Sequence, residues 1–244
     1  NNTRLLRSRS SAIILYGGSI TGRFLTIKNG MAGIILRNNA QSDLKDTIIS
    51  NNQLNGLDIG ENTTLKIDNF KISLTSFFQV HPEQTIRLFE TIADWAKNCT
   101  GRILDAFCGV GAISLWLGQS GLRVIGIEEL PQAILDARAS AQENNIESCT
   151  FIEGKVEDHI RKFKTQDIEI IILDPPRKGC AEKIIQAISE ITPKKIIYIS
   201  CNPSTLARDL ARLENYRIED IVVIDLFPQT QHIETAVLLT LIEP

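Results

Sequence analysis

The sequence predicts an α/β protein with a doubly wound, mostly parallel sheet, preceded by a small β-rich domain. From residue 82 onward, short runs rich in isoleucine and valine alternate with amphipathic stretches of helical period. Such alternation is typical of a parallel sheet whose strands are joined by right-handed helical crossovers. Before residue 75 the pattern consists of short β-branched runs divided by glycine and asparagine, without any proline.

Two domains follow from this change of pattern, one over residues 1–75 and one over 76–244. In the first, runs such as "AIILYGG" and "AGIILRN" are separated by turn sequences such as "KNG", which predicts a small antiparallel β domain. Residues 1–70 carry a net charge of about +3 within a chain of net charge −3. This asymmetry favours an anionic partner for the first domain.

The second domain begins with a helix and continues as alternating strands and helices. Strands buried on both faces are expected to be continuous apolar runs, and ligands of such sheets bind beyond the carboxyl ends of the strands. A last strand is expected to run antiparallel to its neighbours. The expected helices are 82–97, 112–120, 131–145, 181–191 and 203–214, and the expected strands are 102–107, 123–129, 149–155, 168–174, 194–200, 217–227 and 232–242.

Composition excludes several classes of protein. No run of 18 apolar residues and no signal peptide occurs, so we expect no membrane partner. The five cysteines form no C-x-x-C pair, which predicts reduced thiols, no metal or iron–sulfur cluster within this chain, and a cytoplasmic location. We also expect a monomer, and a chain that begins at Asn1 without methionine is expected to be a trimmed chain or a fragment.

A glycine-rich turn, "LDAFCGVGAIS", follows the first strand of the second domain. Gly109 and Gly111 allow a tight turn and the close approach of a ligand, and Glu128 at the end of the second strand is placed to bind ribose hydroxyls. A dinucleotide fingerprint has a third glycine where Ser114 stands. The turn therefore favours a nucleoside without a pyrophosphate, such as S-adenosylmethionine (SAM), over a nicotinamide dinucleotide.

A second turn, "LDPPRKG", ends the fourth strand of this domain. Its Asp174-Pro175-Pro176 sequence is similar to the substrate-side motif of many SAM methyltransferases. Enzymes that methylate base amino groups usually have an aromatic residue next, but here Arg177 follows, which favours a phosphate-bearing partner.

Cys201 follows the fifth strand, in "YISCNPSTLARDL". Asn202 is a good N-cap and Pro203 suits the first helical turn, so the thiol is predicted to lie just ahead of a helix N-terminus. That environment favours an anion and therefore a reactive thiolate. Position alone leaves a buried structural cysteine equally open.

Six motifs, in order along the chain, together resemble one family over residues ~70–244. This family is the RNA uridine carbon-5 methyltransferases, which form 5-methyluridine in tRNA and 23S rRNA. The motifs are "FFQV" (77–80), "LDAFCGVG" (104–111), "GIEELPQAI" (126–134), "LDPPRKG" (173–179), "ISCNPSTLARDL" (199–210) and "FPQTQHIE" (227–234).

The resemblance implies a Rossmann-like SAM-dependent methyltransferase domain and a role for each matching residue. Cys201 would be the nucleophile, Glu234 the base, and His232 structural. Apart from the resemblance, Arg177 and Arg208 are candidates to hold RNA phosphates. The SAM-binding residues would be Gln79, Asp105, Phe107, Gly109, Gly111, Glu128 and Asp174, with Asp174 also facing the uracil.

Two positions depart from the family pattern, because His81 and Ala112 stand where members usually or sometimes have asparagine. The N-terminal RNA-binding barrel and the cysteine-bound cluster of many members are also not matched. Residues 1–75 resemble the central β domain of the family, with the given sequence starting within that domain. They are expected to face RNA. The predicted substrate is a uridine in RNA, with rRNA favoured over tRNA.

Other functions remain to be weighed against this one. A base amino-group methyltransferase needs no cysteine, and a cytosine carbon-5 enzyme usually has a cysteine where Arg177 stands. A nicotinamide oxidoreductase would explain the glycine turn but not residues 199–234. A non-catalytic RNA-binding or scaffold protein with this fold has no need for both Cys201 and Glu234.

Overall fold

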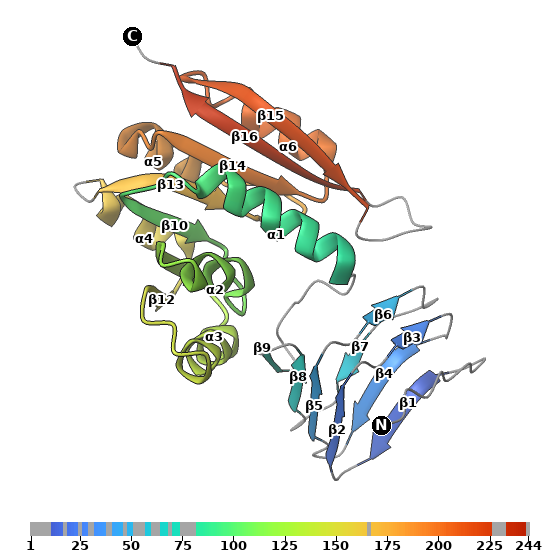
Figure 1. Cartoon of the computed structure of the whole chain (residues 1–244). Coiled ribbons are helices and arrows are strands. Elements are labelled where there is room, and N and C mark those ends of the chain that lie inside the picture. Colours follow the sequence, from blue (N-terminus) through green and yellow to red (C-terminus); the bar gives the residue numbers. More distant parts are fainter. Residues whose placement is uncertain are drawn as a thin grey trace.

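The computed structural model describes short strands between residues 11 and 73, and residues 82–164, 167–225 and 233–242. Side chains are described from residue 84 onward. Gln79, which the sequence placed in the site, and His232, which was expected to be structural, lie outside the described residues. Figure 1 shows the arrangement of the elements. Among the described residues, no helix is both long and apolar enough to cross a membrane.

The strands before residue 75 pair mainly in parallel, so the expectation of an antiparallel domain was wrong. Three sheets have the orders β1-β4-β7, β2-β5-β8-β9 and β3-β6, and of their pairs only β8–β9 is antiparallel. The strands are β1 (Ser11–Tyr16), β2 (Ser19–Arg23), β3 (Thr26–Lys28), β4 (Ala32–Arg37), β5 (Gln41–Lys45), β6 (Ile48–Ser50), β7 (Leu57–Ile59), β8 (Thr64–Ile67) and β9 (Phe70–Ser73).

A repeat explains this parallel pairing. Ser11 pairs with Ala32 and Thr26 with Ile48, so partners lie about 22 residues apart along the chain. Apart from β9, which pairs with its neighbour β8, each of these strands therefore pairs with the equivalent strand of an adjacent repeat, as in a solenoid, and not with its neighbour across a hairpin.

The rest of the chain forms one seven-stranded sheet of order β12-β11-β10-β13-β14-β16-β15. Six of these strands run in the same direction, and β16 is antiparallel to both of its neighbours, β14 and β15, as predicted. The strands are β10 (Arg102–Ala106), β11 (Arg123–Glu128), β12 (Cys149–Glu153), β13 (Ile168–Leu173), β14 (Lys195–Ser200), β15 (Tyr216–Ile224) and β16 (Glu234–Leu241).

Helices cover both faces of this sheet because its strands are apolar on both sides. Ile103 and Ile170 pack with α1 and α2, whereas the next residues along each strand, Leu104 and Ile171, pack with α4 and α5. The helices are α1 (Pro82–Ala96), α2 (Ala112–Gln119), α3 (Pro131–Glu143), α4 (Val156–His159), α5 (Glu182–Ile191) and α6 (Pro203–Leu210). The sequence did not predict α4 or the 3₁₀ helix Ile160–Phe163 that follows it.

The strand order reverses between β10 and β13, which lie side by side. The connections from these two strands leave toward opposite sides of the sheet, so a crevice opens beyond their carboxyl ends. The fold therefore places the glycine turn after β10 and the Asp-Pro-Pro turn after β13 on either side of one crevice.

Candidate active site

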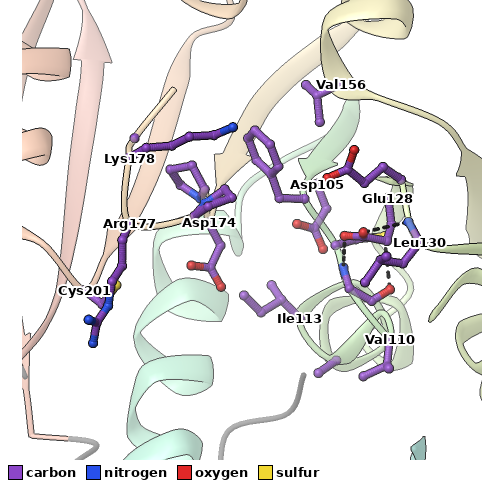
Figure 2. Close-up of a pocket in the computed structure, with 18 of the residues that line it drawn as sticks. Asp105, Val110, Ile113, Glu128, Leu130, Val156, Asp174, Arg177, Lys178 and Cys201 are labelled. Carbon is purple, nitrogen blue, oxygen red and sulfur yellow. Dashed lines mark hydrogen bonds between the residues drawn. The ribbon is translucent and has the colours of Figure 1, made fainter. Parts of the chain in front are cut away.

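A cavity of about 720 Å³ occupies this crevice, a volume in the range of small-molecule sites. Figure 2 shows side chains from the two turns and from the ends of the neighbouring strands facing into it. The cavity brings together most residues that the sequence placed in the site. These are Asp105, Phe107, Gly109, Glu128, Asp174, Arg177, Cys201 and Glu234.

The glycine turn has the backbone that its sequence indicates. Gly109 and Gly111 have φ angles of 54° and 78°. Phe107, the first residue after β10, has a φ angle of 70°, a conformation that is rare for residues other than glycine. A side chain at Gly109 would meet no atom within 4 Å, so this residue opens onto the cavity. Gly111 does not line the cavity, because it packs against the ring of Phe151.

Glu128 is held at the edge of the cavity by the backbone. Its Oε2 accepts a hydrogen bond from the amide of Gly109 (3.2 Å) and its Oε1 accepts one from the amide of Leu130 (2.9 Å) (Figure 2). These contacts fix the carboxylate between the first two strands. The remaining lone pairs are available to ligand hydroxyls.

Asp105 lies beneath the glycine turn and is 1% exposed. Its Oδ2 accepts a hydrogen bond from Ser114 Oγ at 2.6 Å, whereas its Oδ1 has no partner among the described atoms. Burial raises the pKa of Asp105 to about 7, although the hydrogen bonds from Ser114 oppose this effect. A buried carboxyl oxygen without a partner is costly unless a ligand satisfies it.

Asp174 directly follows β13 and Glu234 begins β16, and both line the cavity. Burial, followed by the charges of Glu234 and Asp105, raises the pKa of Asp174 well above its ordinary value. Burial raises the pKa of Glu234 to about 7. Because adjacent buried carboxylates repel each other, we expect Asp174 to hold its proton at neutral pH while Glu234 titrates there.

Cys201 directly follows β14 and precedes α6, as predicted. The side chain of Asn202 accepts a hydrogen bond from the amide of Ser204 at 3.1 Å and so caps α6, and Pro203 is its first residue. Ser200 is paired with Thr235 in the antiparallel ladder of β14 and β16. Cys201 and Glu234 are the residues next to this pair along the two chains, and both line the cavity.

The two arginines differ in position. Arg177 lines the cavity, whereas Arg208 does not. Arg208 directs its Nε to Asp209 and its Nη2 to both Asp209 and the carbonyl oxygen of Lys178. Phosphate binding by either arginine stays a prediction.

Sequence reasoning missed the apolar wall of the cavity. Its side chains come from α1, the glycine turn, α2, the loop after β11 and the start of α4, and they include Leu88, Phe89, Val110, Ile113, Leu130 and Val156. Leu130 follows Glu128 at the end of β11 by two residues and is 43% exposed. The sequence signal that could have identified Leu130 as a cavity residue was its position two residues after Glu128.

The model of the tRNA (uracil-5-)-methyltransferase family matches residues 56–242. This chain belongs to the tRNA (uracil-5-)-methyltransferase family. The match begins before the predicted domain boundary at residue 75 and leaves residues 1–55 outside it.

Relatives of the family come from several bacteria. An uncharacterized RNA methyltransferase of Clostridium acetobutylicum is 44% identical over 176 residues, which are 70% of this chain and 38% of that protein. One from Listeria innocua is 44% identical over 192 residues, which are 76% of this chain and 42% of that protein. The chain thus spans about two fifths of the length of these relatives.

Solved structures agree with the family assignment. The crystal structure of Pyrococcus abyssi tRNA (uracil-54, C5)-methyltransferase in complex with S-adenosyl-L-homocysteine matches with a TM-score of 0.63 and 32% identity, over 70% of this chain and 42% of that one. A precorrin-6y C5,15-methyltransferase from Geobacter metallireducens has a TM-score of 0.53 and 14% identity over 71% of this chain and 94% of its own, which shows the fold alone.

Proposed function

We propose that this chain is the catalytic part of a SAM-dependent methyltransferase that forms 5-methyluridine in RNA. The observation that carries the proposal is that Cys201, Glu234, the glycine turn and Glu128 all line one cavity. Membership of the tRNA (uracil-5-)-methyltransferase family supports the same conclusion.

The residues of the crevice fit SAM. Glu128, fixed by two amides, is placed for ribose hydroxyls, and the exposed face of Leu130 is suited to cover an adenine ring. The unsatisfied Oδ1 of Asp105 and the neighbouring carboxyls suit a ligand that carries positive charge. The turn after β10 lacks the third glycine of a dinucleotide site, as Ser114 there is committed to Asp105.

Each catalytic side chain would have one task. Cys201, as a thiolate, adds to carbon-6 of the uracil, and the electron pair of the 5,6 double bond moves toward the carbonyl oxygen at carbon-4, so carbon-5 becomes nucleophilic. SAM, when bound, supplies an electrophilic methyl group. Glu234 then removes the proton from carbon-5, the 5,6 double bond forms again, and the bond to sulfur breaks to release the Cys201 thiolate.

Burial supports these assignments. A carboxyl with a pKa of about 7 can accept a proton at neutral pH and release it again to water. The raised pKa of Asp174 favours its protonated form, which can donate a hydrogen bond to the base and stabilise the negative charge that develops on it. A uridine that is stacked or paired must leave its stack to reach Cys201.

Nucleoside analysis tests this function. The full chain is incubated with isotopically labelled SAM and separately with unmodified rRNA and tRNA, and the digested RNA is analysed by mass spectrometry. We expect label in 5-methyluridine, and we predict rRNA as the better substrate. Label in a methylated amino group of a base, or no transfer to any RNA, would contradict the proposal.

A further inference from the structure

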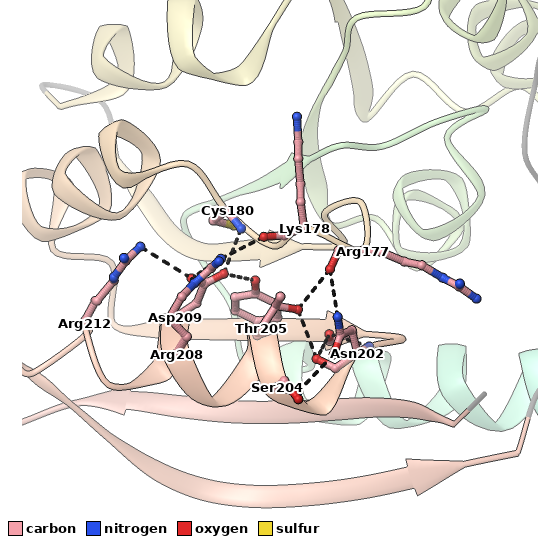
Figure 3. A network of polar contacts seen from close by, with 11 residues as sticks. Arg177, Lys178, Cys180, Asn202, Ser204, Thr205, Arg208, Asp209 and Arg212 are labelled. Atoms are coloured by element: carbon pink, nitrogen blue, oxygen red, sulfur yellow. Dashed lines mark hydrogen bonds and ion pairs between the residues drawn. The ribbon is translucent and has the colours of Figure 1, made fainter. Parts of the chain in front are cut away.

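Helix α6 is fastened to the loop that carries Asp174, Pro175 and Pro176. Figure 3 shows these contacts. The carbonyl oxygen of Arg177 accepts hydrogen bonds from Asn202 Nδ2 (3.1 Å) and Thr205 Oγ1 (3.2 Å). One turn later in the helix, Arg208 donates to the carbonyl oxygen of Lys178 and Asp209 accepts from the amide of Cys180, one and three residues after Arg177 in the loop.

Asp209 is the central acceptor of the hydrogen bonds that join the loop to α6. Its side chain has 0% exposure, and its Oδ2 accepts hydrogen bonds from the amide of Cys180 (2.8 Å) and the hydroxyl of Tyr198 (2.7 Å). Its Oδ1 accepts from Arg208 Nε at 2.9 Å and lies 2.8 Å from Arg208 Nη2, with Arg212 further away at 3.8 Å. A buried carboxylate that is this fully satisfied holds its partners in one geometry.

The loop and α6 are closely packed at Gly179. Gly179 has φ 76°, and a Cβ atom there would collide with the carboxylate of Asp209 and the guanidinium of Arg208. The loop therefore approaches α6 by its bare backbone, and only glycine allows both the turn and the approach. The hydrogen bonds from Arg208 to Lys178 and from Cys180 to Asp209 lie on either side of this point.

The same helix determines the position of Cys201. Asn202 caps α6 with its Oδ1 and binds the carbonyl oxygen of Arg177 with its Nδ2, so one side chain joins the start of the helix to the loop. Asp209 itself does not line the cavity. Any effect of Asp209 on the reaction must therefore pass through the loop and the helix.

We propose that Asp209 is a positioning residue that locks the 175–180 loop onto α6 and so fixes Asp174 and Arg177 relative to Cys201. The proposal rests on the proposed function for its catalytic consequence. Its structural part, the locked loop, is independent of any RNA.

Three measurements on the Asp209→Ala variant of the full chain test this role. Hydrogen exchange of the Cys180 amide should accelerate, because its acceptor is lost. Alkylation of Cys201 by iodoacetamide, followed by peptide mass spectrometry, should accelerate about threefold or more as the loop opens. The kcat for 5-methyluridine formation should fall about tenfold to a hundredfold, as small displacements of reacting groups have effects of this size.

The affinity for S-adenosylhomocysteine, measured by calorimetry, should change much less than kcat. Of the described residues expected to hold it, Gly109 lies in the turn after β10 and Glu128 ends β11, and neither contacts Asp209 or α6 in a described hydrogen bond; Asp174 alone adjoins the loop. Asp209→Asn should give an intermediate result in every measurement, since an amide oxygen can still accept from Cys180 but carries no charge for Arg208. This milder variant also keeps the test valid where Asp209→Ala fails to fold.

Glu169 provides a matched control. It is a carboxylate that also accepts from two backbone amides and a cation, but it lies in the first half of β13, at the end of the sheet away from the cavity. Glu169→Gln should lower stability without changing exchange at Cys180 or alkylation of Cys201. If the Asp209 variants lose stability as Glu169→Gln does, with Cys180 exchange, Cys201 alkylation and kcat unchanged, the proposal is overturned.

Failure of the proposed function gives a different result. A wild-type chain that binds no S-adenosylhomocysteine and methylates no RNA would refute the proposed function. The exchange and alkylation measurements would still decide whether Asp209 locks the loop.

Discussion

Ser114 donates its only hydroxyl proton to Oδ2 of Asp105, and the other oxygen of this buried carboxyl meets no polar partner among the described atoms. The pair sits where β10 passes into the glycine turn. A carboxyl that is oriented by one neighbour and left unsatisfied on its other oxygen is prepared to receive a donor from a ligand.

Binding of the cofactor should therefore depend on pH through Asp105. Burial holds the pKa of Asp105 at about 7, and a bound cation favours the ionised form, so affinity should rise between pH 6 and pH 8 with release of a proton. Calorimetry with S-adenosylhomocysteine, whose amino group is positive, in buffers of different ionisation enthalpy measures this proton. Asp105→Asn should weaken binding about tenfold and remove the pH dependence; an unchanged pH profile would show that another group titrates.

Substitution of Gly111 should destabilise the fold through packing as well as through φ. A Cβ atom at Gly111 would lie 2.8 Å from the ring of Phe151. Gly121 has a similar positive φ of 81° but open space around it, so Gly121→Ala reports the backbone strain alone. We expect Gly111→Ala to cost about 1–3 kcal/mol more than Gly121→Ala in urea unfolding. Equal costs would mean that the ring moves aside.

The carboxylate of Glu169 should stabilise the fold only above acidic pH. Burial on its own raises the pKa of Glu169, but the amide of Gly101, the ammonium of Lys194 and the amide of Thr100 outweigh it and lower the pKa to about 2. A depressed pKa gives stability that is complete above the unfolded value near 4.5 and is lost as pH falls toward 2. Glu169→Gln should cost about 1–2 kcal/mol at pH 7 and little at pH 2. A cost that is equal at both pH values would point to packing instead.

Much of the catalytic fold could be predicted because local and tertiary preferences agree there. The β13 sequence Ile168–Leu173 is apolar throughout, and a strand buried on both faces requires this. Asn202 and Pro203 likewise specify the start of α6 by themselves. The short helix Val156–His159 was not predicted because one turn of helix is too short to show a period.

The parallel pairing before residue 75 was missed because pairing depends on distant residues. Turn sequences such as "KNG" are compatible with hairpins and with the corners of a solenoid, so they do not distinguish the two. The signal that does is the repeat of about 22 residues, visible in the pairing of Ser19 with Gln41 and of Gln41 with Thr64. Similarly, no motif indicated that Asp209 would meet the amide of Cys180, 29 residues away in the sequence.

Cys201 and Glu234 should act at different steps, and variants of each separate them. Cys201→Ala should abolish turnover and leave the affinity for S-adenosylhomocysteine nearly intact, because no covalent bond to carbon-6 can form. Glu234→Gln should permit attack by the thiolate but not removal of the carbon-5 proton. A covalent protein–RNA adduct should then accumulate and appear as a shifted band that resists denaturation.

The double variant and the pH dependence complete this test. Cys201→Ala combined with Glu234→Gln should form no adduct, since the thiol is absent, whereas Cys180→Ala combined with Glu234→Gln should still form it. In the wild type, breakdown of a preformed adduct should accelerate as pH rises through about 7, because only the ionised Glu234 accepts a proton. An active Cys201→Ala enzyme would refute covalent catalysis at this thiol. Normal turnover by Glu234→Gln would instead keep the nucleophile and move the proton transfer to Asp174 or to water.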